Sequence, residues 1–99
     1  MFIALSRFTI ANDMVDEVRS AFHQRPHLVD VASGFLGMEV MNPTDKSAEI
    51  WLFTRWRDAQ SYAKWHGGHT YHESHTGIPK GLKLVPGSAE ITLLQVFAE

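Results

Sequence analysis

Apolar and polar residues alternate along the first ten positions of the chain. From Phe2 to Ile10 every second side chain is apolar, with one exception, the hydroxyl of Ser6. A period of two predicts a β-strand that buries one face. The residues of the opposite face are Ile3, Leu5, Arg7 and Thr9.

Helical spacing follows, from about Asp13 to Val31. Asn12 or Asp13 offers a side-chain oxygen to cap the helix start. Pro26 lies inside this segment, and proline lacks the amide hydrogen that a helix interior needs. We therefore expect Pro26 to kink or split the helix, and Gly34 to end it.

Two strands and a second helix are predicted next. The apolar stretches 35–41 and 48–56 flank the turn residues 42–45, which is typical of a hairpin. Asp58 can cap the following helix, and Gly67 and Gly68 are expected to stop it.

The last third of the chain contains a loop and one more strand. A short helical turn is expected from His69 to His75, and the glycines and prolines of 76–88 predict a loop that could cover a ligand. A final strand is expected from Glu90 to Phe97. The order is the split βαβ pattern of an α+β, ferredoxin-like domain, with a four-stranded antiparallel sheet and both helices on one face. Residues 1–99 have room for this one domain.

Such a sheet leaves one face without helices. We expect this face to be apolar, because Ile3 and Leu5 lie on it and the third strand has one face with Ile50, Leu52 and Trp56. An apolar face of this size normally finds a partner. The sequence therefore predicts a two-fold homodimer that packs sheet on sheet.

Charge and composition exclude several classes. Lys and Arg number nine and the net charge is −2, so no basic face for nucleic acid is expected. The chain has no cysteine, so thiolate sites and disulfides are excluded. Neither a signal peptide nor a membrane-spanning stretch is predicted. A cytoplasmic protein is the default expectation.

Histidines gather at the end of the second predicted helix. His66, His69, His72 and His75 stand three residues apart. If the segment is helical, the last three lie near one another on one side of the helix and could line a pocket. Imidazole is a common metal ligand, but i, i+3 spacing suits a shared metal less well than i, i+4. Solvated surface histidines are the alternative.

Two other residues are candidates for a site. Ser6 places a hydroxyl in an apolar stripe, where it must bond a local partner or point into a polar cavity. Trp65 ends a helix directly before the histidines, where its flat side chain could pack against a flat ligand.

At these residues the chain resembles the antibiotic biosynthesis monooxygenase (ABM) family of dimeric α+β barrels. The resemblance covers nearly the whole chain. The segments that carry it are Met1–Phe8, Arg25–Asp30, Gly34–Met38 and Thr54–Asp58.

Within that family the heme-degrading, IsdG-like branch has the most similar pattern, with Trp65 and His75 ten residues apart. This resemblance implies a heme-binding monooxygenase in which His75 is the axial ligand of the heme iron, Trp65 distorts the porphyrin and His72 helps to bind it. The branch has Asn on the first strand where this chain has Ser6. Ser6 could act through a water.

Two other functions stay open. Some family members oxidise quinols or polyketide-type aromatics without a cofactor, and His72 or His75 would then be the general base. A ligand-binding barrel without turnover is the third possibility, which the serine at position 6 favours.

Overall fold

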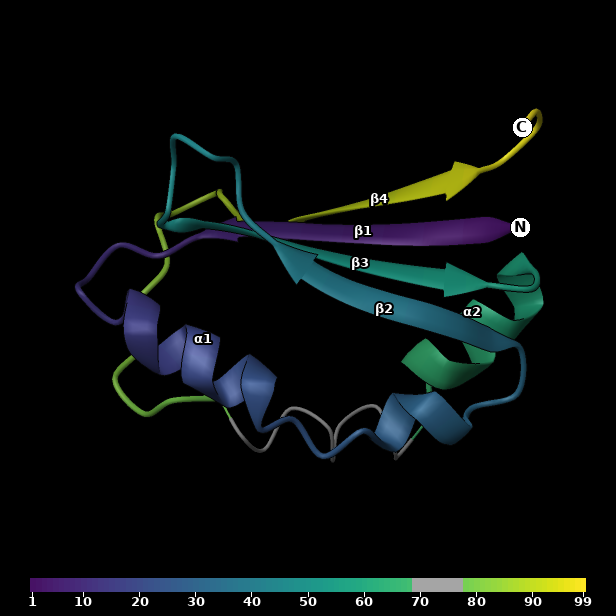
Figure 1. Ribbon diagram of the computed structural model, residues 1–99, viewed down its shortest axis with the longest axis horizontal. Helices are drawn as coiled ribbons and strands as arrows, with labels where there is room; N and C mark the ends of the chain where they lie inside the picture. The colour runs from purple at the N-terminus through teal and green to yellow at the C-terminus, as the bar shows by residue number, and fades with distance from the viewer. Residues whose placement is uncertain (69–77) are drawn as a thin grey trace.

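The computed structural model describes residues 1–68 and 78–99, and its strands form one antiparallel sheet in the order β2-β3-β1-β4. Figure 1 shows α1 and α2 on the same side of this sheet. The prediction of an α+β, ferredoxin-like fold is confirmed. The elements are β1 (Phe2–Thr9), α1 (Val15–His23), a 3₁₀ helix η1 (Leu28–Val31), β2 (Phe35–Met41), β3 (Glu49–Trp56), α2 (Ala59–His66) and β4 (Glu90–Gln95).

The long helix predicted over 13–31 is two separate elements. α1 ends at His23 and η1 begins at Leu28, with Pro26 between them, so the expected split is confirmed. The predicted caps are wrong, because the N-cap is Met14 and has no side-chain hydrogen bond. Asn12 instead donates from Nδ2 to the Gly81 carbonyl, 2.9 Å away, which holds the 78–88 loop to the start of α1.

The predicted cap of α2 is confirmed. The Asp58 carboxylate accepts hydrogen bonds from the Ser61 amide at 2.8 Å and from the Ser61 hydroxyl at 2.7 Å. The hydroxyl bond is the main reason that the pKa of Asp58 lies below its usual value of 3.8, because it favours the charged form. The start of α2 is thus fixed by a local motif that the sequence already contains.

Gly34 lets β2 approach α2. Its φ is +82°, a left-handed conformation that side chains disfavour, and a Cβ built there would lie 2.2 Å from the Ser61 hydroxyl oxygen. Its carbonyl accepts from the Arg57 amide at 2.8 Å, which ties the end of β3 to the start of β2. No other residue fits this position without moving α2.

Two separate groups of buried residues lie between the sheet and the helices. The Trp56 cluster contains Phe2, Val29 and Trp56, with Phe35, Tyr62 and Trp65 among the partly buried residues around it. The Ile50 cluster contains Ile10, Val18 and Ile50, and Phe8 and Phe22 pack against it. Phe2 and Ile10 stand at opposite ends of the first segment, so the clusters occupy opposite ends of the sheet.

The register corrects the prediction for the third strand. Trp56 pairs with Phe2, and Ile50 pairs with Phe8. Since paired residues share a face, Ile50, Leu52 and Trp56 face the helices and not the bare side. The bare face of β3 carries Trp51, Phe53 and Arg55 instead.

The bare face is therefore less apolar than predicted. The Arg7 guanidinium lies over the Trp51 ring, 5.3 Å from its centre, and donates to Glu90 at 3.0 Å. Arg55 lies over Phe53 in the same way and pairs with Glu39 through both Nη1 and Nη2. Each aromatic side chain is thus capped by an ion pair.

Among residues 1–68 and 78–99, no helix is long and apolar enough to cross a membrane.

Candidate functional site

One transverse row of residues crosses the helix-facing side of the sheet between the two clusters. Leu52 of β3 pairs with Val40 of β2 and with Ser6 of β1, and Ser6 pairs with Ile91 of β4. With neighbouring strands ~4.8 Å apart, Ser6 and Val40 are separated by roughly 10 Å across the sheet. Ile91 is 52% exposed although it faces the helix side, so the β4 end of this row is uncovered.

Ser6 is half-buried at the centre of this row. Its side chain forms no hydrogen bond with any described residue, and its hydroxyl is not among the buried polar atoms left without a partner. Because the Ser6 hydroxyl is not buried, water can still reach it. Of the two predicted outcomes, a bonded core serine is therefore excluded for the described part of the chain.

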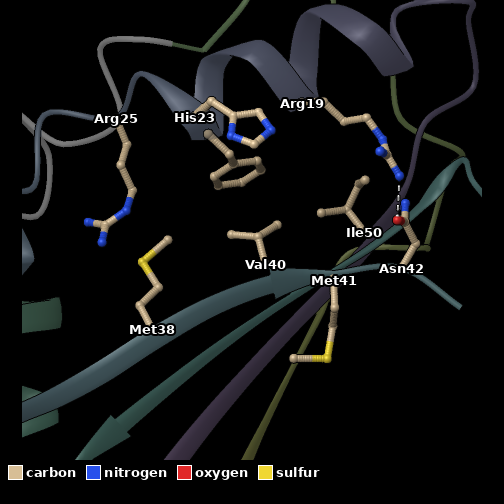
Figure 2. Close-up of a pocket in the computed structure, with 9 residues that line it drawn as sticks. Arg19, His23, Arg25, Met38, Val40, Met41, Asn42 and Ile50 are labelled. Carbon is tan, nitrogen blue, oxygen red and sulfur yellow. Dashed lines mark hydrogen bonds between the residues drawn. The ribbon is translucent and has the colours of Figure 1, made fainter.

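A cleft of about 410 Å³ opens at the β2 end, between α1 and the sheet (Figure 2). Its floor consists of Met38, Val40 and Ile50, and α1 supplies Phe22 and His23 to the opposite wall. Met41 is also at the border, but its side chain points to the other side of β2. The floor is apolar because alternate residues of β2 and β3 point toward the helices.

Polar side chains stand at the end of the cleft where β2 finishes. Arg19 donates from Nη2 to Oδ1 of Asn42 at 2.7 Å. Asn42 in turn donates from Nδ2 to the Ser47 carbonyl at 3.0 Å, which fixes the orientation of its amide. The hairpin turn between β2 and β3 thus holds the Arg19 guanidinium in place.

A second arginine stands at the other end, just beyond α1. Arg25 donates to Asp30 at 2.8 Å, and Nδ1 of His27 lies 3.1 Å from the other oxygen of the same carboxylate. The Arg25 bond is the largest cause of the lowered pKa of Asp30, and His27 adds to it. The positive charge of Arg25 is therefore balanced within the chain.

Trp65 belongs to the Trp56 cluster. It packs against that cluster from the last turn of α2, and neither Trp65 nor Ser6 lines the cleft. Next to it, the Tyr62 ring contacts Phe2 and Trp56 with centroid distances of 5.7 and 5.8 Å. The structure places Trp65 at one end of the sheet and the cleft toward the other.

The predicted histidine segment extends past the described residues. His69, His72 and His75 fall within 69–77, outside the described part, so their predicted roles remain predictions. His66 is described, exposed, and 5.5 Å from Tyr62 between ring centroids. Within the two described ranges, no three His, Cys, Asp or Glu side chains are grouped so that they could hold a metal ion.

Several cleft residues were not predicted as site residues, namely Arg19, His23, Met38 and Asn42. Arg19 and His23 are four residues apart and share one face of α1, which is a signal present in the sequence. Which strand that face meets was not predictable, because it depends on how α1 crosses the sheet.

Comparison with known proteins gives a consistent result. The family model described as antibiotic biosynthesis monooxygenase matches residues 1–77. The structure is similar to the heme-degrader MhuD from Mycobacterium tuberculosis with two hemes in its active site (TM-score 0.80, 18% identity, 100% of this chain and 98% of that chain).

It is also similar to SnoaB, a cofactor-independent oxygenase from Streptomyces nogalater (TM-score 0.76, 16% identity, 99% of this chain and 94% of that chain). At these identities the two likenesses show the fold alone. No curated protein sequence matches the chain.

Proposed function

Because the chain belongs to the antibiotic biosynthesis monooxygenase family, we propose that it is an oxygen-dependent monooxygenase whose ligand lies between the sheet and the helices, with heme as the specific ligand. The family membership supports the reaction class. The identity of the ligand is argued from the residues below.

The observation that carries the proposal is the cleft between α1 and β2. An apolar floor of Met38, Val40 and Ile50 lies between two arginines, Arg19 and Arg25. Heme is a flat, largely apolar ring with two carboxylates on one edge, so the described residues offer it an apolar floor and, at one end, the guanidinium of Arg19, which pairs with no described carboxylate. The floor also continues along the row through Leu52 to Ser6.

Each predicted site residue has a definite task in this proposal. His75 would ligate the iron and His72 would help to hold the ring. Trp65 lies outside the cleft, so its predicted contact with the porphyrin requires that the ring extend past the cleft toward α2. Ser6 would orient a water or the ligand through its hydroxyl, which has no bond to any other described residue. The apolar floor would exclude bulk water. Heme, when bound, supplies an iron that can take up dioxygen beside the porphyrin ring.

The test is a titration of the purified protein with hemin. We expect a saturable shift of the Soret band that is lost in His75→Ala and retained in His23→Ala. His23 is the matched control, because it is the imidazole that lines the cleft among the described residues. Loss of the Soret shift in His23→Ala alone would show that His23 of α1, and not His75, ligates the heme iron. No saturable shift in the wild type would rule heme out.

Turnover is a separate step of the same experiment. With a reductant and oxygen, the heme spectrum should decay in the wild type and more slowly in Ser6→Ala. A stable spectrum in the wild type would leave a heme-binding barrel without catalysis.

Cofactor-free oxidation of an aromatic substrate is the second candidate, and His23 favours it. Its imidazole stands in the wall of an apolar cleft, is exposed, and has no hydrogen-bond partner among the described residues. An imidazole in this position can act as a general base toward a phenol or quinol. Oxygen consumption with a naphthoquinol should then fall in His23→Ala; if only His72→Ala or His75→Ala reduces it, the base is one of those residues.

The same proposal includes a homodimer through the bare sheet face. Ile3, Leu5 and Phe53 lie on that face, and Leu94 beside Ile3 is 40% exposed. Light scattering should give a dimer mass for the wild type and a smaller mass for Leu5→Glu. A monomeric wild type at micromolar concentration would exclude the dimer.

A further inference from the structure

The two arginines of the cleft differ in how their charge is balanced. Arg25 pairs with Asp30, whereas Arg19 contacts the neutral amide of Asn42. In the described parts of the chain, no carboxylate lies within ion-pair distance of Arg19. The Asn42 end of the cleft therefore carries a positive charge that the described residues leave uncompensated.

This charge belongs to an exposed side chain whose guanidinium is oriented by a hydrogen bond. Asn42 accepts from Nη2 of Arg19 and is itself anchored to the Ser47 carbonyl at 3.0 Å. Arg19 has five N–H donors, and this bond occupies one of them. The other donors can bind a carboxylate, and such charge-assisted bonds are roughly twice as strong as neutral ones.

The lining next to Arg19 is apolar and free of acids. Phe22, Val40 and Ile50 border the cleft beside it, and none of the residues that line the cleft is Asp or Glu. Figure 2 shows the Arg19 side chain pointing toward Asn42 at one end, with Val40 and Ile50 between it and the Arg25 end. A ligand that fits has an apolar body and an acidic group at one end.

We propose that this cleft selects flat apolar molecules that carry a carboxylate, and that Arg19 binds the carboxylate while the apolar body lies on Val40 and Ile50. This rests on the proposed function in one respect, that the cleft is the ligand site. Arg25 is less suited to bind this carboxylate, because it already forms an ion pair with Asp30. The carboxylate belongs either to a porphyrin propionate or to a smaller aromatic acid.

The test compares acids with their esters at equilibrium, without a reductant. The probes are protoporphyrin IX, its dimethyl ester, anthracene-2-carboxylic acid and the methyl ester of that acid, followed by fluorescence. The wild type should bind at least one acid about ten-fold or more tightly than its ester. Preference for the porphyrin acid alone identifies a propionate, and preference for the anthracene acid identifies a smaller aromatic acid.

Variants assign the preference to one residue. Arg19→Gln should abolish it, and Asn42→Asp should weaken it by supplying an internal carboxylate to Arg19. Arg57→Gln is the matched control, because Arg57 pairs with Asp58 and does not line the cleft. Melting curves establish that each variant is folded.

Three results would overturn the inference: equal binding of acid and ester by the wild type, full preference in Arg19→Gln, or loss of preference in Arg25→Gln alone. Failure of the proposed function is distinguishable, because a protein that prefers acids yet never consumes oxygen contradicts only the monooxygenase proposal.

Discussion

The Trp56 cluster and the Ile50 cluster differ in what covers them, although they share one face of one sheet. The Trp56 cluster lies beneath η1 and α2, and Trp56 has no exposed surface. The Ile50 cluster lies beneath α1, and Ile50 is at once a core residue and part of the cleft floor.

This difference explains where a ligand site can form. Aromatic rings fill the space at the Trp56 end, where Phe35 and Tyr62 stack edge-on against Trp56 at centroid distances of 5.4 and 5.8 Å. At the Ile50 end, α1 packs on smaller side chains, and the cleft stays open. Ser6 lies between the two ends, where neither cluster reaches.

The largest expected effect tests whether the clusters are independent. Trp56→Ala should lower the free energy of unfolding by about 3–5 kcal/mol and Ile10→Val by about 0.5–1.5 kcal/mol, because of the cavities they leave. The two sites are roughly 26 Å apart along β1, at ~3.3 Å per residue. Urea unfolding of the double variant should therefore give the sum within about 0.5 kcal/mol.

A coupling above about 1 kcal/mol would show that the clusters act as one core. If Trp56→Ala does not fold, Trp56→Phe takes its place in the same cycle.

The next effect concerns how the two helices begin. Asp58→Ala should lower the melting temperature because it removes the cap of α2, whereas Asp13→Ala should leave it unchanged because Asp13 does not cap α1. The pKa of Asp58 is lowered in the fold, so its contribution is present above the usual value of 3.8 and is lost as the pH falls through the lowered value. The melting temperatures of the wild type and of Asp58→Ala should therefore become equal at acid pH.

A smaller effect is expected at the Arg25 end of the cleft. Asp30→Asn should cost about 0–1 kcal/mol at neutral pH, since its ion pairs are partly exposed and screened by solvent. The pKa of Asp30 is also lowered, so this cost should disappear as the pH falls through that value. Urea unfolding of Asp45→Asn, a turn carboxylate for which no ion pair is described, is the control and should match the wild type at each pH.

The smallest effect is expected in the row between the clusters. Ser6→Ala should change the free energy of unfolding by less than about 0.5 kcal/mol, because its hydroxyl has no bond to lose among the described residues. Thr54→Val is the contrast, since the Thr54 hydroxyl accepts from Nε1 of Trp56 at 2.9 Å and its loss should cost about 1–3 kcal/mol. A loss in Ser6→Ala as large as in Thr54→Val would mean that Ser6 is a bonded core residue.

Much of the fold could be predicted because its causes are local. The alternation from Phe2 to Ile10 placed the helix-facing side of β1, and the Asp58–Ser61 motif placed the start of α2. Pro26 divided α1 from η1 through its own covalent structure. The predicted cap at Asn12 is absent because α1 begins only at Val15, and the Asn12 side-chain nitrogen instead bonds the Gly81 carbonyl, 69 residues away.

The sequence by itself determined the order of helices and strands along the chain, the buried face of β1 and the ABM family, because periodicity, caps and family segments lie within short stretches. Only the tertiary structure decided which face of β3 is bare and that Arg19 meets Asn42. The reason is physical: the pairing register selects the face of a strand, and the crossing of α1 over β2 brings together residues 23 positions apart. The cleft, and the charge at its end, exist only after that packing.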